Sequence, residues 1–272
     1  MMTIPAGAGA LDYFPCRYGA SRSVFRGPER DLTRPYVAML GGSQTFGKYV
    51  ARPFPVLVEQ ALGQPVANLG GLNAGPDFYL SDPATLEVAG RAAAAVVQVP
   101  GAEALSNAFY TVHSRRNDRF LAATPALRGL FPEVDFADIH FTRHLLLVLR
   151  RTDEARFGAV VHELRANWLA RMRALLAPLP SRRLLLWLSD GAPSPEDPAA
   201  NGPLFIDRGL LDSLRPEVAG VVEVVPSAAA CALAPQDMTY PETEATQAAC
   251  LPGAAVHAEI AAQLVPALKP LV

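Results

Sequence analysis

The sequence contains little cysteine. Its three cysteines, Cys16, Cys231 and Cys250, are widely spaced in a chain of 272 residues. They form neither the paired spacing of a metal site nor the dense pattern of a disulfide-stabilised secreted domain. We therefore expect a protein of a reducing compartment, the cytoplasm, with no structural metal.

The chain also lacks a positive charge excess and long apolar runs. Its formal net charge is −2, which argues against a general nucleic-acid binder. No uncharged apolar stretch approaches the ~18 residues of a membrane span. The N-terminal residues do not place an apolar run after a basic segment, so we expect no secretion signal. A small anionic or carbohydrate substrate is the expected partner, and a homo-oligomer stays open.

Half of the residues are hydrophobic, which is enough for the core of one large α/β domain. Short apolar runs bounded by glycine, proline or charge are typical of buried parallel strands. Five runs fit: Tyr36–Leu40, Pro65–Leu69, Ala93–Val99, Leu184–Leu188 and Val221–Val225. Helical patterns cover Pro55–Leu62, Asp153–Leu176 and Ala254–Leu268. This alternation predicts a parallel sheet with helices on both faces, a three-layer α/β/α fold of flavodoxin type.

Two segments do not follow this alternation. Residues 1–35 are rich in arginine, glycine and proline and predict an irregular N-terminal arm. Residues 100–152 are too long for a simple connection, so we expect a partly helical cap inserted after the third strand. We find no linker between domains and predict a single domain over residues 1–272.

The stretch "LGGSQTFGKY", from Leu40 to Tyr49, permits two interpretations. The first is a phosphate-binding loop of a nucleotide-dependent kinase, because Gly42 and Gly47-Lys48 have nearly the right spacing. Such a loop opens into a long helix and places Ser or Thr after the lysine. Here Tyr49 follows the lysine, and two prolines within the next two turns would break the helix. The phosphate-loop interpretation is therefore the weaker one.

The second interpretation is a turn that presents Ser43 at the carboxyl end of the first strand. Ligands bind at that edge in open α/β sheets. Gly41 and Gly42 would allow a sharp turn. The backbone N–H of Ser43 could then face a developing oxyanion.

Two further turns follow the next strands: "VANLGGLNAGPD", from Val66 to Asp77, and "VVQVPGAEALSN", from Val96 to Asn107. Together with the serine turn, this order resembles the SGNH (GDSL-like) hydrolase family. The resemblance implies that Ser43 is the nucleophile. It also implies that the backbone N–H near Asn73 and the side chain of Asn107 form the oxyanion hole, without any cofactor. The segments "CRYGASR", "FYTVHSRRNDRF" and "HFTRH" are also similar to an uncharacterised alphaproteobacterial family of SGNH-like fold.

The chain departs from the SGNH pattern at the general base. The family carries an Asp-x-x-His pair before its last helix, whereas this chain has Asp237 and then Tyr240. Tyrosine has a pKa near 10 and is a poor base at neutral pH. The candidate bases are then His257, in the last helix, and secondarily His113. The family also places its Asn two residues after the glycine of the third turn, whereas Asn107 lies six residues after Gly101.

Arginine clusters suggest the substrate. Arginine suits bidentate binding of carboxylate, phosphate or sulfate. Candidate binding residues come from the arm and the cap: Arg17, Arg22, His113, Arg115, Arg116 and Arg143. Structural ion pairing is the alternative fate of these arginines. His140 and His144 would share a helix face but lack a third ligand, so we predict no metal site.

Two functions remain open at this point. The first is a hydrolase or acyl transferase that acts on O-acyl esters of an anionic glycan or of another small anionic substrate. The second is a catalytically degraded SGNH-like scaffold that binds an anionic ligand without turnover.

Overall fold

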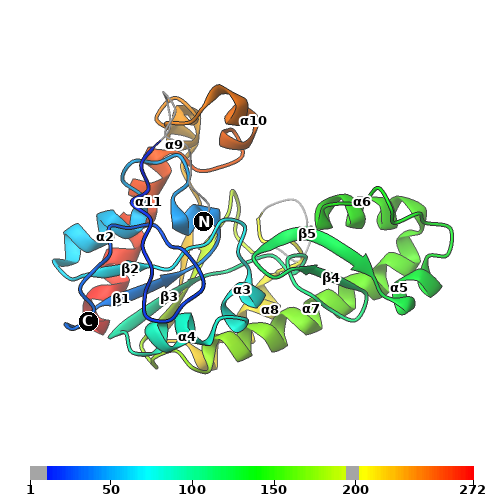
Figure 1. The fold of residues 1–272 in the computed structure, drawn as a ribbon, viewed down its shortest axis with the longest axis horizontal. Helices are drawn as coiled ribbons and strands as arrows, with labels where there is room; N and C mark the ends of the chain where they lie inside the picture. Colours follow the sequence, from blue (N-terminus) through cyan, green and yellow to red (C-terminus); the bar gives the residue numbers. More distant parts are fainter. Residues whose placement is uncertain (1–10, 194–201) are drawn as a thin grey trace.

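The computed structural model describes residues 11–193 and 202–272, and its centre is a five-stranded parallel sheet (Figure 1). The strands lie in the order β2 (Val66–Asn68), β1 (Val37–Leu40), β3 (Ala94–Gln98), β6 (Arg183–Leu188) and β7 (Gly220–Val224). Counted along the chain, this is the order 2-1-3-4-5 of flavodoxin-like folds. All five predicted strands are confirmed, and the strand order reverses its direction across the sheet between β1 and β3.

Both faces of the sheet are buried. Val37 and Met39 of β1 pack into one apolar cluster, while Ala38 and Leu40 pack into another on the opposite face. The first cluster includes helices α2 (Phe54–Leu62), α9 (Ala228–Leu233) and α11 (Ala254–Leu268). The second includes α3 (Pro76–Leu80), α4 (Pro83–Gly90), α7 (Glu154–Leu176) and α8 (Arg208–Asp212). The predicted three-layer α/β/α architecture is therefore confirmed.

The long predicted helices are present with nearly the expected ends. Helix α2 ends at Gly63, whose φ of 66° lies in the left-handed region that glycine tolerates. Helix α7 begins after Asp153, whose side chain accepts a hydrogen bond from the Arg156 N–H at 2.8 Å. Short helices complete the chain: α1 (Ser43–Phe46), α10 (Ala245–Ala248), and 3₁₀ turns at Arg215–Glu217, Glu242–Glu244 and Lys269–Leu271.

The segment inserted after β3 contains more than the helices we expected. It forms an antiparallel hairpin of β4 (Tyr110–His113) and β5 (Arg116–Ala123), followed by α5 (Pro125–Leu130) and α6 (Thr142–Thr152). These elements extend to one side of the main sheet (Figure 1). The hairpin was not predicted because its turn and the start of β5 are polar, including the run Arg116–Arg119, so no apolar run marks its strands.

The described part of the N-terminal arm, residues 11–35, is irregular, with one isolated bridge between Cys16 and Phe25. Its first ten residues lie outside the described part of the chain. Arg26 anchors the arm, because its buried guanidinium donates hydrogen bonds to the carbonyl oxygens of Gly47, Val50 and Ala51. The arm therefore supports the turn that follows α1.

No helix in the described residues is long and apolar enough to cross a membrane. The three cysteines all lie in this part of the chain, and none forms a disulfide.

Candidate functional site

Ser43 lies at the carboxyl end of the sheet, at the first residue of α1. The turn before it requires Gly41, because a Cβ at that position would overlap Thr45 Oγ1 and the side chain of Gln98. The buried hydroxyl of Tyr79 fixes the same turn by accepting the Gly41 N–H at 2.7 Å and donating to the Gly41 carbonyl at 2.8 Å. Ser43 therefore stands at the reversal point between β1 and β3, where open α/β sheets bind ligands.

The geometry does not favour a phosphate-binding loop. Helix α1 has only four residues and ends at Gly47, with φ of 76°. Lys48 turns toward another part of the chain, where its Nζ lies 3.0 Å from a carboxylate oxygen of Glu244 and 2.7 Å from Gln247 Oε1. Both the long helix and the free lysine of a phosphate loop are therefore missing from this stretch.

Asn73 holds the Ser43 hydroxyl at two points. Ser43 Oγ donates to Asn73 Oδ1 at 2.9 Å and accepts the Asn73 N–H at 3.0 Å. Asn73 has a φ of 54°, a left-handed conformation that asparagine adopts more readily than most residues. Because an amide oxygen is a very weak base, this contact orients the Ser43 hydroxyl without removing its proton.

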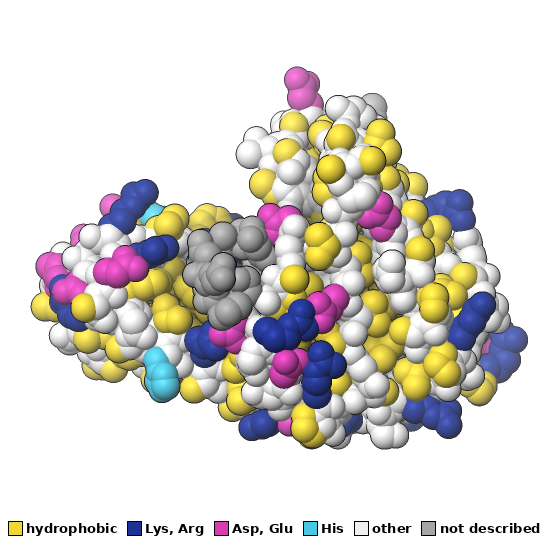
Figure 2. Space-filling view, turned by 180° about the vertical axis from the view of Figure 1, so that it is seen from behind, with side chains coloured by type: hydrophobic (Ala, Val, Ile, Leu, Met, Phe, Trp, Pro, Cys, Tyr) yellow, Lys and Arg dark blue, Asp and Glu magenta, His cyan; other side chains and the backbone are white. Residues whose placement is uncertain are grey.

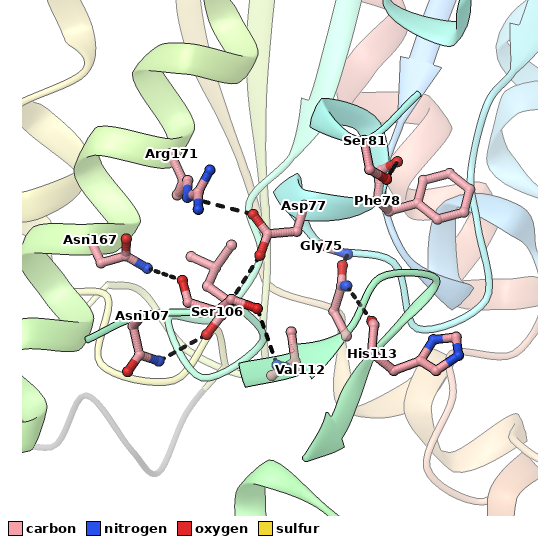
Figure 3. A network of polar contacts seen from close by, with 12 residues as sticks. Gly75, Asp77, Phe78, Ser81, Ser106, Asn107, Val112, His113, Asn167 and Arg171 are labelled. Atoms are coloured by element: carbon pink, nitrogen blue, oxygen red, sulfur yellow. Dashed lines mark hydrogen bonds and ion pairs between the residues drawn. The ribbon is translucent and has the colours of Figure 1, made fainter. Parts of the chain in front are cut away.

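The hairpin of the inserted segment holds Asn73 in turn. Asn73 Nδ2 donates to Asp118 Oδ2 at 3.2 Å, and the Asn117 N–H donates to the Asn73 carbonyl at 3.0 Å. The fully buried Asn117 side chain accepts the Gly75 N–H at 2.6 Å and donates to the His113 carbonyl. Figure 3 shows Gly75 and His113 on either side of this contact. The glycine turn after β2 and the hairpin therefore form one polar network beside Ser43.

The same network extends toward helix α7. Asp77 Oδ2 accepts the Ser106 N–H at 3.0 Å, and Asp77 Oδ1 lies 3.6 Å from Arg171 Nε (Figure 3). Asn167 donates to the Ser106 carbonyl at 3.0 Å. These contacts fix the start of the inserted segment against the body of the fold.

A cavity of about 470 Å³ opens in front of Ser43. Its walls come from the ends of β1, β3 and β6, from the glycine turn, from the hairpin and from α6. Polar side chains include Ser43, Gln44, Asn73, Gln98 and Ser189. In the described part of the chain, the charged side chains of the lining are Glu103, Asp118, Arg143 and Asp190.

Glu103 is one of the cavity residues that the sequence did not predict. It occupies the position two residues after Gly101, where the SGNH family has its Asn. The residue is only 8% exposed, and its Oε1 lies 3.5 Å from Arg143 Nε. Burial raises the pKa of Glu103, and the positive charge of Arg143 opposes this rise only in part. The signal in the sequence is the position of Glu103 two residues after Gly101, although its side chain is a carboxyl group and not the amide that the resemblance implies.

The structure does not bring Asn107 to Ser43. Asn107 Oδ1 accepts the N–H groups of Phe109 and Tyr110 at 2.8 and 3.1 Å, and its Nδ2 donates to the Leu105 carbonyl at 2.9 Å. The side chain thus closes the turn that leads into the hairpin (Figure 3). Asn107 does not line the cavity.

His257 also lies away from the cavity. It is 1% exposed, its Nδ1 accepts the Phe54 N–H at 3.1 Å, and its ring stacks on that of Phe54. Burial, aided by the charge of Arg26, lowers the pKa of His257 to about 3. The imidazole is therefore neutral at neutral pH and anchors α11 to α2.

The remaining candidates for a base are placed elsewhere as well. Tyr240 packs edge-on against Tyr49, and Asp237 accepts the Ala255 N–H at the start of α11 at 2.8 Å. His113 is exposed at the hairpin turn, where its Nδ1 accepts the N–H groups of Arg115 and Arg116. All five histidines of the chain lie among the described residues, and none lines the cavity.

The arginines predicted to bind substrate do not converge. Arg17 donates to the carbonyl of Arg22 within the arm, while Arg115 and Arg116 are exposed at the hairpin turn. Only Arg143 lines the cavity. On the face shown in Figure 2, basic side chains are scattered among acidic ones rather than gathered into one patch.

A larger hollow of about 890 Å³ lies near the opposite ends of the strands, between the arm and α4. The arginines that line it are paired with carboxylates: Arg30 with Glu59, Arg34 with Asp31, and Arg91 with Glu87. We assign no site there. Among the described residues, no group of three or more His, Cys, Asp or Glu side chains is arranged to hold a metal ion.

No curated protein and no solved structure matches the chain. A family model described as "Domain of unknown function (DUF6473)" matches residues 1–272, so the chain belongs to that family.

Proposed function

We propose that the protein binds a small, hydroxyl-rich molecule such as a sugar in the cavity beside Ser43, without cleaving it through an activated serine. One observation carries this proposal. The Ser43 hydroxyl donates to an amide oxygen, and all five histidines lie away from the cavity. A serine nucleophile needs a base within hydrogen-bond reach. Of the two functions suggested by the sequence, the geometry therefore favours binding.

The chemistry of the cavity indicates the ligand. Hydroxyl, amide and carboxylate groups line it, and sugar hydroxyls both donate to and accept from such groups. Its volume of about 470 Å³ lies in the range of small-molecule sites. Among the described residues, three carboxyl groups and one guanidinium line the cavity, which disfavours the anionic ligand suggested by the arginine content.

The prediction concerns binding of D-glucose as a neutral sugar probe. In ¹H–¹⁵N NMR titrations, the amide signals of Ser43, Asn73 and Gly101 are expected to shift with a common Kd. The signals of Gly63 and Gly129, far from the cavity, should stay in place. If the shifts appear only at remote residues, or are absent at saturating sugar, the proposal is wrong.

A variant that blocks the cavity tests whether the amide shifts arise from binding there. A Cβ at Gly42 would meet only the Ala74 carbonyl oxygen, at 3.4 Å, so Gly42→Leu places its side chain in the open space before Ser43. This variant should abolish the shifts. The matched control is Gly129→Leu in α5, where a Cβ meets nothing within 4 Å. The control should bind like the wild type.

Acyl-ester hydrolysis or acyl transfer is the second candidate. The observation that favours it is the placement of Ser43, which lines the cavity and whose Oγ accepts the Asn73 N–H. A carboxylate of the cavity would then have to act as the base. Hydrolysis of p-nitrophenyl acetate by the wild type, lost in Ser43→Ala, would favour this candidate over binding alone.

A further inference from the structure

Two residues that line the cavity each have one buried carboxyl oxygen without a hydrogen-bond partner. Among the described residues, only three buried side-chain nitrogen or oxygen atoms lack a partner: Glu103 Oε2, Asp118 Oδ1 and Asp237 Oδ1. The first two belong to residues of the Ser43 cavity. Since most buried polar atoms in proteins are hydrogen-bonded, this coincidence requires an explanation.

The two carboxyl groups come from different walls of the cavity. Glu103 follows β3, and its Oε2 lies so close to Gly101 that a Cβ there would overlap it. Asp118 belongs to β5, and its other oxygen accepts from Asn73. A ligand that reaches both residues would therefore meet two carboxyl groups that come from different elements of the fold.

The charged groups around these acceptors are mostly acidic. Arg143 of α6 faces Glu103, but its side chain is 67% exposed, so its charge is shared with solvent. Asp190, after β6, adds a third carboxyl group to the lining. A carboxylate only accepts hydrogen bonds, so its natural partner is a donor that carries positive charge.

We propose that the ligand of this cavity carries a protonated amine, which Glu103 and Asp118 bind. This inference rests on the proposed binding function and adds the charge of the ligand. An ammonium group has three N–H donors and compensates the excess of carboxyl groups. Among organic cations, an amino sugar is the class that combines an ammonium group with the hydroxyl groups that suit this lining.

The test compares three sugars of similar size and different charge: D-glucosamine, D-glucose and D-glucuronate. Each is titrated into the full-length protein near neutral pH, and Kd is measured from the amide shifts of Ser43 and Gly101. We expect glucosamine to bind about tenfold or more tightly than glucose, as charge-assisted hydrogen bonds do relative to neutral ones. Glucuronate should bind most weakly.

Variants assign the preference to the two carboxyl groups. Glu103→Gln and Asp118→Asn keep size and remove charge, and each should reduce the preference for glucosamine over glucose. Asp138→Asn, an exposed residue outside the cavity, makes the same charge change and should leave it intact. If Asp118→Asn disturbs the fold through Asn73, as its unfolding curve would show, Glu103→Gln carries the test alone.

The outcomes separate the two proposals. Equal binding of glucosamine and glucose, or tightest binding of glucuronate, would overturn the ammonium inference and leave the sugar site standing. A preference for glucosamine that survives both substitutions would also overturn it. Absence of cavity shifts with all three sugars would overturn the proposed function as well.

Discussion

Lowering the pH from 7 to 4 is expected to cost the wild type about 3 kcal/mol more of its free energy of unfolding than it costs a His257→Gln variant. Burial lowers the pKa of His257 from 6.5 to about 3. Below pH 6.5 the unfolded chain takes up a proton on this residue, while the folded chain does not until the pH nears 3. The stability that the neutral His257 contributes is therefore fully present above pH 6.5 and is lost as the pH falls toward 3.

The measurement is urea unfolding at pH 7, 6, 5 and 4 on both proteins. The glutamine side chain introduced by His257→Gln would retain an acceptor for the Phe54 N–H, and the carboxyl groups common to both proteins cancel in the difference. The control His144→Gln removes an exposed histidine of α6 and should follow the wild type. Equal losses in the wild type and His257→Gln would contradict the burial of a neutral imidazole between α2 and α11.

Replacing Arg26 by Met is expected to lower the free energy of unfolding by about 3 to 5 kcal/mol. Arg26 is 6% exposed and donates to the carbonyls of Gly47, Val50 and Ala51. Met retains an apolar side chain of similar length but no donor. The buried Val50 carbonyl would then lose this partner, at about 1 to 3 kcal/mol when nothing replaces the bond. The Gly47 carbonyl would keep only the Val50 N–H, at 3.2 Å.

The measurement is urea unfolding at pH 7, with Arg22→Met as the matched control. Arg22 lies in the same arm but is exposed, so its substitution should change stability by less than about 0.5 kcal/mol. If the two substitutions lower the free energy of unfolding equally, the hydrogen bonds of Arg26 do not hold the turn after α1. Arg26→Met should also weaken sugar binding, because the turn that Arg26 holds directly follows α1, the helix that begins at Ser43.

The sheet could be predicted from sequence because its signals are local. Buried parallel strands appear as short apolar runs, and Gly63 marks the end of α2 directly. The hairpin could not be predicted in the same way. Its strands pair with each other while the polar side chains of Arg116 and Arg119 stay exposed, so no apolar run reveals them.

Some residues of the site could likewise be predicted from local sequence patterns, and others could not. Ser43 and Asn73 follow adjacent strands, and the edge rule for parallel sheets was enough to place them near each other. Asp118 reaches the cavity only through the path of the inserted hairpin, which local patterns do not encode. His257 fits a helical stripe equally well as a base or as a core residue, and only the packing of α11 on α2 decides between them.

The central claim is that the hydroxyl of Ser43 is held but not activated, and reaction with a fluorophosphonate probe tests it most directly. Purified wild-type protein and Ser43→Ala are incubated with the probe near neutral pH, with a known serine hydrolase as positive control and with folding verified by cooperative unfolding. Because the Ser43 hydroxyl donates to an amide oxygen, we expect no labelling of the wild type above the level of Ser43→Ala. Strong labelling of the wild type that disappears in Ser43→Ala would contradict it and would show that a base reaches Ser43.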